Sequence, residues 1–181
     1  MVVKNHVNKK DLLKKMTHIV TPNYMNFSWL IENELAGHRG IQSDEHLQFL
    51  KGKGVKALIR MTQVSRVTSK DLERVGFLDY HLSIPDMSAP ALHDINLMIE
   101  FIEQCLSQDK PVGVSCDGGY GRTGCLLSCF FITRGMDAPG AINFVKDKRP
   151  GSVLTDDQDQ AVYQFAASYK PGLHNKKKGA I

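Results

Sequence analysis

The chain has 181 residues, the length of one ordinary domain, which is enough to bury a core without disulfides or a structural metal. Hydrophobic residues make up 42% of it and charged residues 23%, as in globular proteins, and no window approaches the roughly 18 consecutive apolar residues of a membrane helix. Much of the basic character comes from lysines near the two ends, so we predict basic end segments at residues 1–20 and 171–181 around one domain at residues 21–170.

The first half of this domain is predicted to be mainly strands. Apolar and β-branched runs predict short strands at residues 27–31 and 34–36, and further strands at residues 55–61 (VKALIRM) and 77–84. A helix is predicted at residues 46–51. Trp29, the only tryptophan, is interpreted as a core anchor because aromatic side chains chiefly bury area.

The second half is predicted to be mainly helical. A helix over residues 92–108 is indicated by apolar side chains that recur on one face, namely Ile95, Met98, Ile99, Ile102 and Leu106. A short apolar strand at residues 111–115 enters a glycine-rich turn, and residues 125–132 (CLLSCFFI), apolar on nearly every face, predict a buried central helix. This order predicts an α/β sandwich with a partly parallel sheet, in which ligands gather at the C-terminal ends of the strands.

Two capped helices are predicted to complete the domain. Asp137 followed by Pro139 is typical of a helix start, and the turn at residues 149–151 (RPG) ends that helix. Thr155 and Gln158 have the spacing of a capping box at the start of a last helix. Its inward stripe is predicted to be Val162, Phe165, Ala166 and Tyr169.

The four cysteines show neither a CxxC pair nor a His/Cys spacing suited to zinc, so we expect no disulfide framework. Each is either a small buried hydrophobe or a reactive thiolate, depending on its surroundings. The N-terminal residues are basic but include no apolar core or small-residue cleavage site of a secretion signal, and we therefore expect a cytoplasmic protein.

Residues 114–124 (VSCDGGYGRTG) form a segment suited to holding an oxyanion. Its glycines let the backbone curl so that successive N–H groups face inward, and the start of the next helix adds its positive dipole end. Arg122 can donate two N–H bonds to phosphate oxygens, and Cys116 lies at the base of the loop, where these groups favour its thiolate form. A C-x5-R match alone is weak evidence, but the preceding strand, the glycines, Thr123 and the following helix favour a phosphate loop over a buried cysteine beside a turn.

The loop also resembles a known family. SCDGGYGRTG is similar to the signature of the cysteine-based protein tyrosine phosphatases, usually HCxxGxxR followed by Ser or Thr, and IPD at residues 84–86 is similar to their general-acid loop. NFSWLIENELAG at residues 26–37 and RPGSVLTDDQDQAVYQF at residues 149–165 extend the resemblance to the small atypical dual-specificity phosphatases, especially the kind called dual-specificity phosphatase 23. The resemblance covers nearly the whole chain except its tails. It implies the protein tyrosine phosphatase-like sandwich, with a central mostly parallel sheet flanked by helices and no metal or organic cofactor.

The resemblance also implies roles for individual residues. Cys116 is the nucleophile that forms a cysteinyl-phosphate, Arg122 binds the phosphoryl oxygens, and Asp86 donates a proton to the leaving group. Thr123 either donates its hydroxyl to the departing sulfur or is an ordinary first-turn helix residue. Gln158 either positions the hydrolytic water or serves only in the capping box. The substrate is held by the loop residues between the cysteine and the arginine, namely Asp117, Gly118, Gly119, Tyr120 and Gly121.

Two features of the sequence leave these assignments open. Asp79 is a second candidate acid, although its place within FLDYHLSI also suits a solvent-facing strand residue. Ser115 stands where the family has His directly before the cysteine. Because that His helps to fix the loop and to favour the thiolate, we predict reduced but real activity, which Ser115→His should raise.

The favoured substrates are protein phosphomonoesters, and the resemblance implies action on phosphotyrosine and on phosphoserine or phosphothreonine. Asp117 and Tyr120 stand where phosphoinositide-directed relatives carry lysines, and a carboxylate should repel a polyanionic headgroup. The alternatives are a phosphoinositide or RNA 5′-phosphate phosphatase and a catalytically silent phosphate-binding module. We expect a monomer whose partner is a phosphorylated protein or peptide, with no nucleic-acid partner and no membrane insertion.

Overall fold

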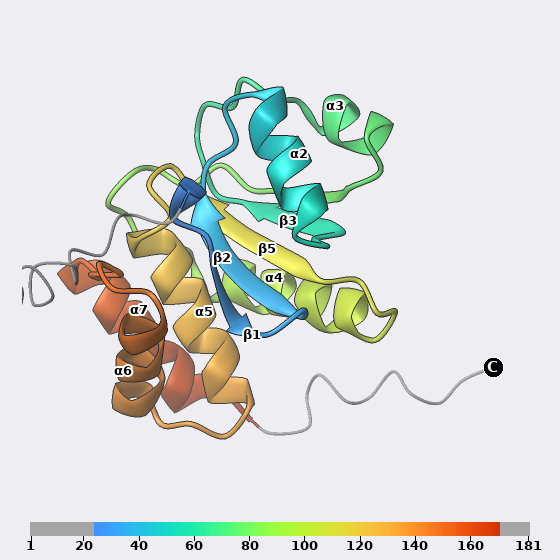
Figure 1. Ribbon diagram of the computed structural model, residues 1–181. Coiled ribbons are helices and arrows are strands. Elements are labelled where there is room, and N and C mark those ends of the chain that lie inside the picture. Colours follow the sequence, from blue (N-terminus) through green and yellow to red (C-terminus); the bar gives the residue numbers. More distant parts are fainter. Residues whose placement is uncertain (1–23, 171–181) are drawn as a thin grey trace, which may run out of the picture.

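A five-stranded sheet of order β1-β2-β5-β3-β4 lies at the centre of the computed structural model, which describes residues 24–170 (Figure 1). The two predicted basic end segments lie outside these residues. The strands are β1 (Ser28–Ile31), β2 (Leu35–Arg39), β3 (Ala57–Arg60), β4 (Leu78–His81) and β5 (Val112–Cys116). Strand β1 pairs antiparallel with β2, and the pairs β2 with β5, β5 with β3, and β3 with β4 are all parallel. The predicted mostly parallel sheet is confirmed.

Helices cover both faces of the sheet (Figure 1). The single 3₁₀ turn η1 (Tyr24–Asn26) precedes β1. Helices α2 (Asp44–Gly52) and α3 (Ser69–Arg74) lie over one face. The other face is covered by α4 (Leu92–Leu106), α5 (Gly121–Thr133), α6 (Ala138–Lys148) and α7 (Asp156–Ser168).

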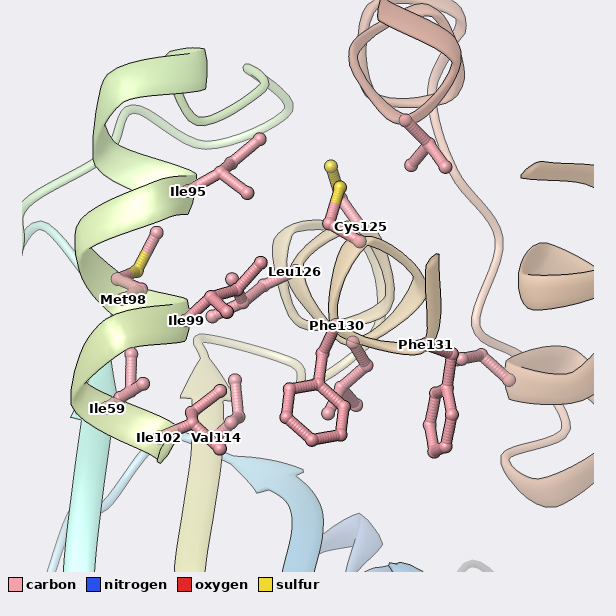
Figure 2. Packing of buried hydrophobic residues seen from close by; sticks show 14 of the residues in the cluster. Ile59, Ile95, Met98, Ile99, Ile102, Val114, Cys125, Leu126, Phe130 and Phe131 are labelled. Carbon is pink, nitrogen blue, oxygen red and sulfur yellow. The ribbon is translucent and has the colours of Figure 1, made fainter. Parts of the chain in front are cut away.

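The larger core lies between the sheet and helices α4 to α7. Because side chains alternate along a strand, Ala57 and Ile59 of β3 enter this core, whereas Leu58 enters the smaller core under α2 and α3. In Figure 2, Ile95 and Ile99 of α4 point toward α5, which is seen end-on, and Leu126 lies next to Ile99 between the two helices. Every residue of β5 is buried, as expected for a central parallel strand with both faces covered.

The predicted helix boundaries and caps agree closely with the structure. The Asp137 side chain accepts a hydrogen bond from the Gly140 amide (2.9 Å), and Thr155 and Gln158 form the predicted capping box. Trp29, predicted to be a core anchor, is only partly buried; it packs against the smaller core and meets the Phe27 ring edge-on at 5.2 Å.

Two details of the structure go beyond the prediction. In α4 Cys105 is a further buried residue, while Leu106 is partly buried and packs against the larger core as predicted. Helix α3 was missed because its six residues bury only Leu72, which gives no periodic signal. No helix within residues 24–170 is long and apolar enough to cross a membrane.

The topology brings four loops to one edge of the sheet. Strand β5 lies between β2 and β3, and all of β2, β3, β4 and β5 run in the same direction. The loops that follow them begin at residues 40, 61, 82 and 117. Because the carboxyl ends of parallel strands meet at one edge, side chains from these loops converge there.

Candidate active site

The predicted phosphate loop joins two buried elements of the fold, β5 and α5. Cys116 is the last residue of β5, α5 begins at Gly121, and Arg122 is its second residue. No side chain caps the α5 N-terminus, where Tyr120 is the N-cap residue. The helix therefore presents its first N–H groups and the positive end of its dipole toward the loop.

Three donors outside the loop hold three successive loop carbonyls. The amide of Gly40 bonds the carbonyl of Asp117 (3.0 Å), and Asn26 Nδ2 bonds that of Gly118 (3.2 Å). Arg149 Nη2 bonds the carbonyl of Gly119 (2.8 Å). In a trans peptide unit the C=O and N–H point in opposite directions. The N–H groups that share these three peptide units are thereby turned away from the outer donors, toward the inside of the loop.

Gly119 is needed because of this close packing. Its φ of 77° lies in the left-handed region, and a Cβ at this position would lie 2.4 Å from the carbonyl oxygen of His38. Any side chain would therefore be strained and would collide with the backbone of β2. Gly118 differs, because a Cβ there would meet only the Tyr120 ring, at 2.9 Å.

Arg122 is buried, and its guanidinium has four protein acceptors. Its Nη1 donates to the carbonyls of Met61 (2.9 Å) and Ile84 (2.6 Å), in the loops that follow the neighbouring strands β3 and β4. Its Nη2 donates to Asp86 Oδ1 and to Asp117 Oδ2, both at 2.7 Å. The sequence predicted a guanidinium that faces phosphate, but it gave no sign that two carboxylates would share one of its nitrogens.

The predicted acid Asp86 lies at the same cavity as Cys116. Its side chain is 70% exposed, and its backbone amide donates to Gln63 Oε1 (3.3 Å). The cavity has a volume of about 510 Å³. It is lined by Asp86, Met87, Cys116, Asp117, Gly118, Tyr120, Gly121, Arg122, Val153, Leu154, Thr155 and Gln158.

The alternative acid Asp79 lies elsewhere, and the suggestion that it faces solvent was wrong. Its carboxylate accepts two hydrogen bonds from Arg60, each at 2.7 Å, and one from Ser69 Oγ (2.7 Å). Both side chains of this ion pair are 2% exposed. Burial raises the pKa of Asp79, but the hydrogen bonds from Arg60 and Ser69 outweigh it, so the net pKa is lowered. Asp79 thus has a structural partner and takes no place at the cavity.

Thr123 and Gln158 are both buried beside the loop. Thr123 Oγ1 has no hydrogen-bond partner among residues 24–170. Such an unpaired hydroxyl is expected if it donates only to an acceptor that forms transiently during the reaction. Gln158 lines the cavity and serves as a cap at the same time: Oε1 accepts from the Thr155 amide (3.1 Å), and Nε2 donates to the Ser88 carbonyl (3.0 Å). The two readings of Gln158 are therefore compatible.

Ser115 occupies a buried position on the sheet face opposite the larger core. Its Oγ lies 3.3 Å from the Ile59 carbonyl, and it is in register with His38 on β2 and Arg60 on β3. Burial lowers the pKa of His38 to about 4, so its imidazole is neutral at neutral pH. Its Nδ1 lies 2.7 Å from the Arg39 carbonyl, while Nε2 has no partner among the described residues.

Four residues of the site were missed from the sequence, namely Thr62, Asn26, Gly40 and Arg149. Thr62 Oγ1 donates to an Asp117 carboxylate oxygen. Arg149 was read only as part of a turn, yet its buried guanidinium also reaches the Gly37 carbonyl. These residues come from distant parts of the chain, and nothing in their immediate neighbours signals a contact with the loop.

A second cavity, of about 560 Å³, lies at the other end of α5 and is lined by residues 132–138 with Ala166 and Tyr169. It contains none of the predicted site residues. The chemistry-bearing side chains are gathered at the edge of the sheet, where α5 begins.

A cysteine at the end of the central strand and an arginine at the start of the next helix, joined by a loop with outward carbonyls, define a phosphate-loop protein of the α/β class. Residues 36–136 match the family model Tc-R-P, described as polymorphic toxin system, DSP-PTPase phosphatase. The chain belongs to this DSP-PTPase phosphatase family, and so to the cysteine-based protein tyrosine phosphatase superfamily.

Individual relatives agree with this assignment. The dual specificity protein phosphatase CDC14B of Mus musculus is 26% identical over 144 residues, which cover 79% of this chain and 29% of that protein. Protein tyrosine phosphatase domain-containing protein 1 of Mus musculus is 33% identical over 168 residues, which cover 80% of this chain and 22% of that protein. The chain thus spans less than a third of either relative.

Solved structures support the fold. The crystal structure of Tk-PTP in its active form has a TM-score of 0.73 at 22% identity and covers 79% of this chain and 97% of that one. PTPMT1 in complex with PI(5)P has a TM-score of 0.71 at 15% identity, with 78% and 94% covered. The finer resemblance to the dual-specificity phosphatase 23 kind stays a prediction.

Proposed function

We propose that the protein hydrolyses phosphomonoesters through a cysteinyl-phosphate intermediate. The observation that carries this proposal is that Cys116, Arg122 and Asp86 line one cavity, whose floor is a loop with three outward-bonded carbonyls. Family membership supports the same chemistry. Each residue then has a distinct role.

In the first step the Cys116 thiolate attacks phosphorus. A phosphorus–sulfur bond forms, the bond to the ester oxygen breaks, and Asp86 gives its proton to the leaving oxygen. The inward loop N–H groups and Arg122 stabilise the negative charge on the phosphoryl oxygens. Asp86 is suited to this step because its exposed carboxyl lies at the mouth of the cavity, where a leaving group would stand.

In the second step water attacks the cysteinyl-phosphate. The phosphorus–sulfur bond breaks, Asp86 accepts a proton from the water, and inorganic phosphate leaves. Thr123 Oγ1, which has no partner within residues 24–170, is placed in the first turn of α5 and donates to the departing sulfur. Gln158 lines the cavity beside Gly121, and we assign it to orienting the water.

Turnover of p-nitrophenyl phosphate tests the proposal. We expect activity in the wild-type protein and none in Cys116→Ser, which keeps the shape of the site but removes the nucleophile. Asp86→Ala should lose far more rate on alkyl phosphates than on activated aryl phosphates, because only poor leaving groups need the proton. Equal losses on both substrates would remove Asp86 from the acid role.

The proposed substrates are phosphotyrosine and phosphoserine or phosphothreonine in proteins. Two carboxylates, Asp86 and Asp117, stand at the cavity and disfavour a polyanionic substrate. PTPMT1, a fold neighbour, was crystallised with PI(5)P, so phosphoinositides form the alternative class, together with RNA 5′-phosphates. A panel of phosphopeptides, phosphoinositides and 5′-phosphorylated RNA would discriminate among them, and a lack of turnover on all of them would favour a silent phosphate-binding module.

Three further proposals rest on the sequence. Residues 21–170 are the phosphatase domain, the protein acts in the cytoplasm, and it is a monomer. Size-exclusion chromatography with light scattering tests the oligomeric state, and cell fractionation tests the location.

A further inference from the structure

The guanidinium of Arg122 has five N–H groups, and four of them are directed at protein acceptors. The two hydrogens of Nη1 go to the carbonyls of Met61 and Ile84, and the two of Nη2 go to Asp86 and Asp117. Only the Nε hydrogen is left. Arg122 is also buried, so its side chain has little room to reorient toward other partners.

A phosphate bound in a fork takes two parallel N–H bonds from one edge of the guanidinium. One edge pairs Nε with Nη2, and the other pairs Nη1 with Nη2. Both forks require Nη2, the nitrogen that the two carboxylates share. A phosphate that is to be gripped by Arg122 must therefore displace at least one of these carboxylates.

Asp117 is built into this position more firmly than Asp86. It belongs to the loop itself, its carbonyl is held by the Gly40 amide, and Thr62 Oγ1 donates to its other carboxylate oxygen. Burial raises the pKa of Asp117, but the bonds from Thr62 and Arg122 outweigh it and lower the pKa, so the carboxylate is charged at neutral pH. Its side chain is 54% exposed and has space to turn outward.

We propose that Asp117 is an internal competitor of the substrate phosphate for Arg122 Nη2, held in place by Thr62. This inference rests on the proposed function of the same loop. It also names a substrate preference. The Asp117 carboxylate belongs to the loop and lines the cavity, where it repels a second anionic group on the substrate and pairs with a cationic group close to the phosphoester. The favoured substrates are thus single phosphomonoesters with a neighbouring basic group.

Binding of inorganic phosphate tests the competition without any need for turnover. We expect Asp117→Asn to bind phosphate about tenfold more tightly in isothermal titration, because the amide keeps the size of the side chain but gives up the charged hydrogen bond to Arg122. Asp117→Ser should also tighten phosphate binding, and it keeps the test valid if the Asp117→Asn protein does not fold. Thr62→Val should tighten binding about threefold, since it releases one oxygen of Asp117, and Thr62→Ser should restore the wild-type value.

The matched control is Asp156→Asn. Asp156 follows Thr155, which lines the cavity. The substitution Asp156→Asn therefore removes one negative charge near the cavity, as Asp117→Asn does, but leaves the bonds of Arg122 intact. We expect its phosphate affinity to change by less than about twofold, because an exposed charge is screened by solvent and salt. If Asp156→Asn and Asp117→Asn bound phosphate equally more tightly than the wild type, the effect would come from net charge alone, and the proposal would be overturned. Unchanged or weaker phosphate binding by both Asp117 variants would overturn it as well.

Paired phosphopeptides test the preference. A peptide with arginine next to the phosphorylated residue should show a kcat/KM about tenfold above that of its glutamate counterpart in the wild type, and this ratio should fall to about twofold in Asp117→Asn. The two proposals fail separately. If the wild type turns over esters but the Asp117 variants bind phosphate no more tightly, the competition proposal is refuted and the phosphatase proposal stands. If the variants bind phosphate more tightly but no ester is hydrolysed, the phosphatase proposal is refuted and the competition proposal stands.

Discussion

Arg149 and Gly119 are joined by a 2.8 Å hydrogen bond from Nη2 to the loop carbonyl, and Arg149 Nη1 also reaches the Gly37 carbonyl on β2. The arginine is buried and makes no ion pair with a carboxylate within residues 24–170. Burial lowers the pKa of Arg149 to about 10, while its electrostatic interaction with the nearby ionisable groups of Cys116 and Tyr120 acts to raise it. A thiolate at Cys116 is therefore a favourable partner for this buried cation.

Removing that cation should slow the thiolate chemistry. We expect Arg149→Met to reduce the rate of Cys116 alkylation by iodoacetamide at pH 7 about tenfold, and kcat/KM about a hundredfold, because both the charge and the support of Gly119 are lost. Arg134→Met is the control, since Arg134 is an exposed arginine paired with Glu103. Alkylation of Arg149→Met at the wild-type rate would contradict the electrostatic part of this account.

The two central glycines of the loop should respond differently to alanine. Gly119→Ala places a Cβ against the His38 carbonyl at a positive φ, so we expect a loss of about a hundredfold or more in kcat/KM and a lower melting temperature. Gly118→Ala meets only the Tyr120 ring, which can turn aside, and should retain activity within about threefold. Similar losses in both variants would mean that the contact with β2 does not decide the loop shape.

The two candidate acids should separate in stability and rate. Asp79→Asn leaves Arg60 as a buried charge without its carboxylate and should lower the free energy of unfolding in urea by about 3 kcal/mol. Asp86→Asn removes an exposed group, so its stability should change by less than about 1 kcal/mol while its turnover of alkyl phosphates falls. An Asp79→Asn protein as stable as the wild type would refute the structural role.

The stability of the fold should depend on pH through His38. Its pKa is lowered from 6.5 to about 4 by burial, so between these values the unfolded chain binds the extra proton and the folded protein does not. The free energy of unfolding should therefore fall by about 3 kcal/mol as the pH decreases from about 6.5 to about 4. Below about pH 4, His38 should cause no further change. The difference between wild type and His38→Gln in urea denaturation at several pH values isolates the effect, and parallel curves would exclude it.

Restoring the family histidine at position 115 requires space. Ser115 is buried and in register with His38, so Ser115→His alone should overpack this face and destabilise the fold. We expect the double variant Ser115→His with His38→Ala to keep more stability than the single one and to show higher kcat than the His38→Ala parent. A double variant no more active than that parent would argue against the proposed effect of Ser115.

Contiguity in the sequence explains which parts of the site could be predicted. Residues 116–122 follow one another between a strand and a helix, so their spacing alone indicated the loop, and the family resemblance added Asp86. Asn26, Thr62 and Arg149 reach the loop from far along the chain, and such contacts depend on the sheet order, which periodicity does not give. Asp79 was misread for the same reason, since its partner Arg60 lies on the neighbouring strand.

The loop connects two elements that are shielded from solvent: β5 is buried along its whole length, and α5 is buried from Arg122 to Ile132. Amide hydrogens in both elements should exchange with deuterium only when the entire domain unfolds. Adaptation to a bound molecule then falls to the neighbouring segments that carry Thr62 and Asp86. Changes of backbone shape on binding should accordingly be confined to those two segments, while the phosphate cradle keeps one shape.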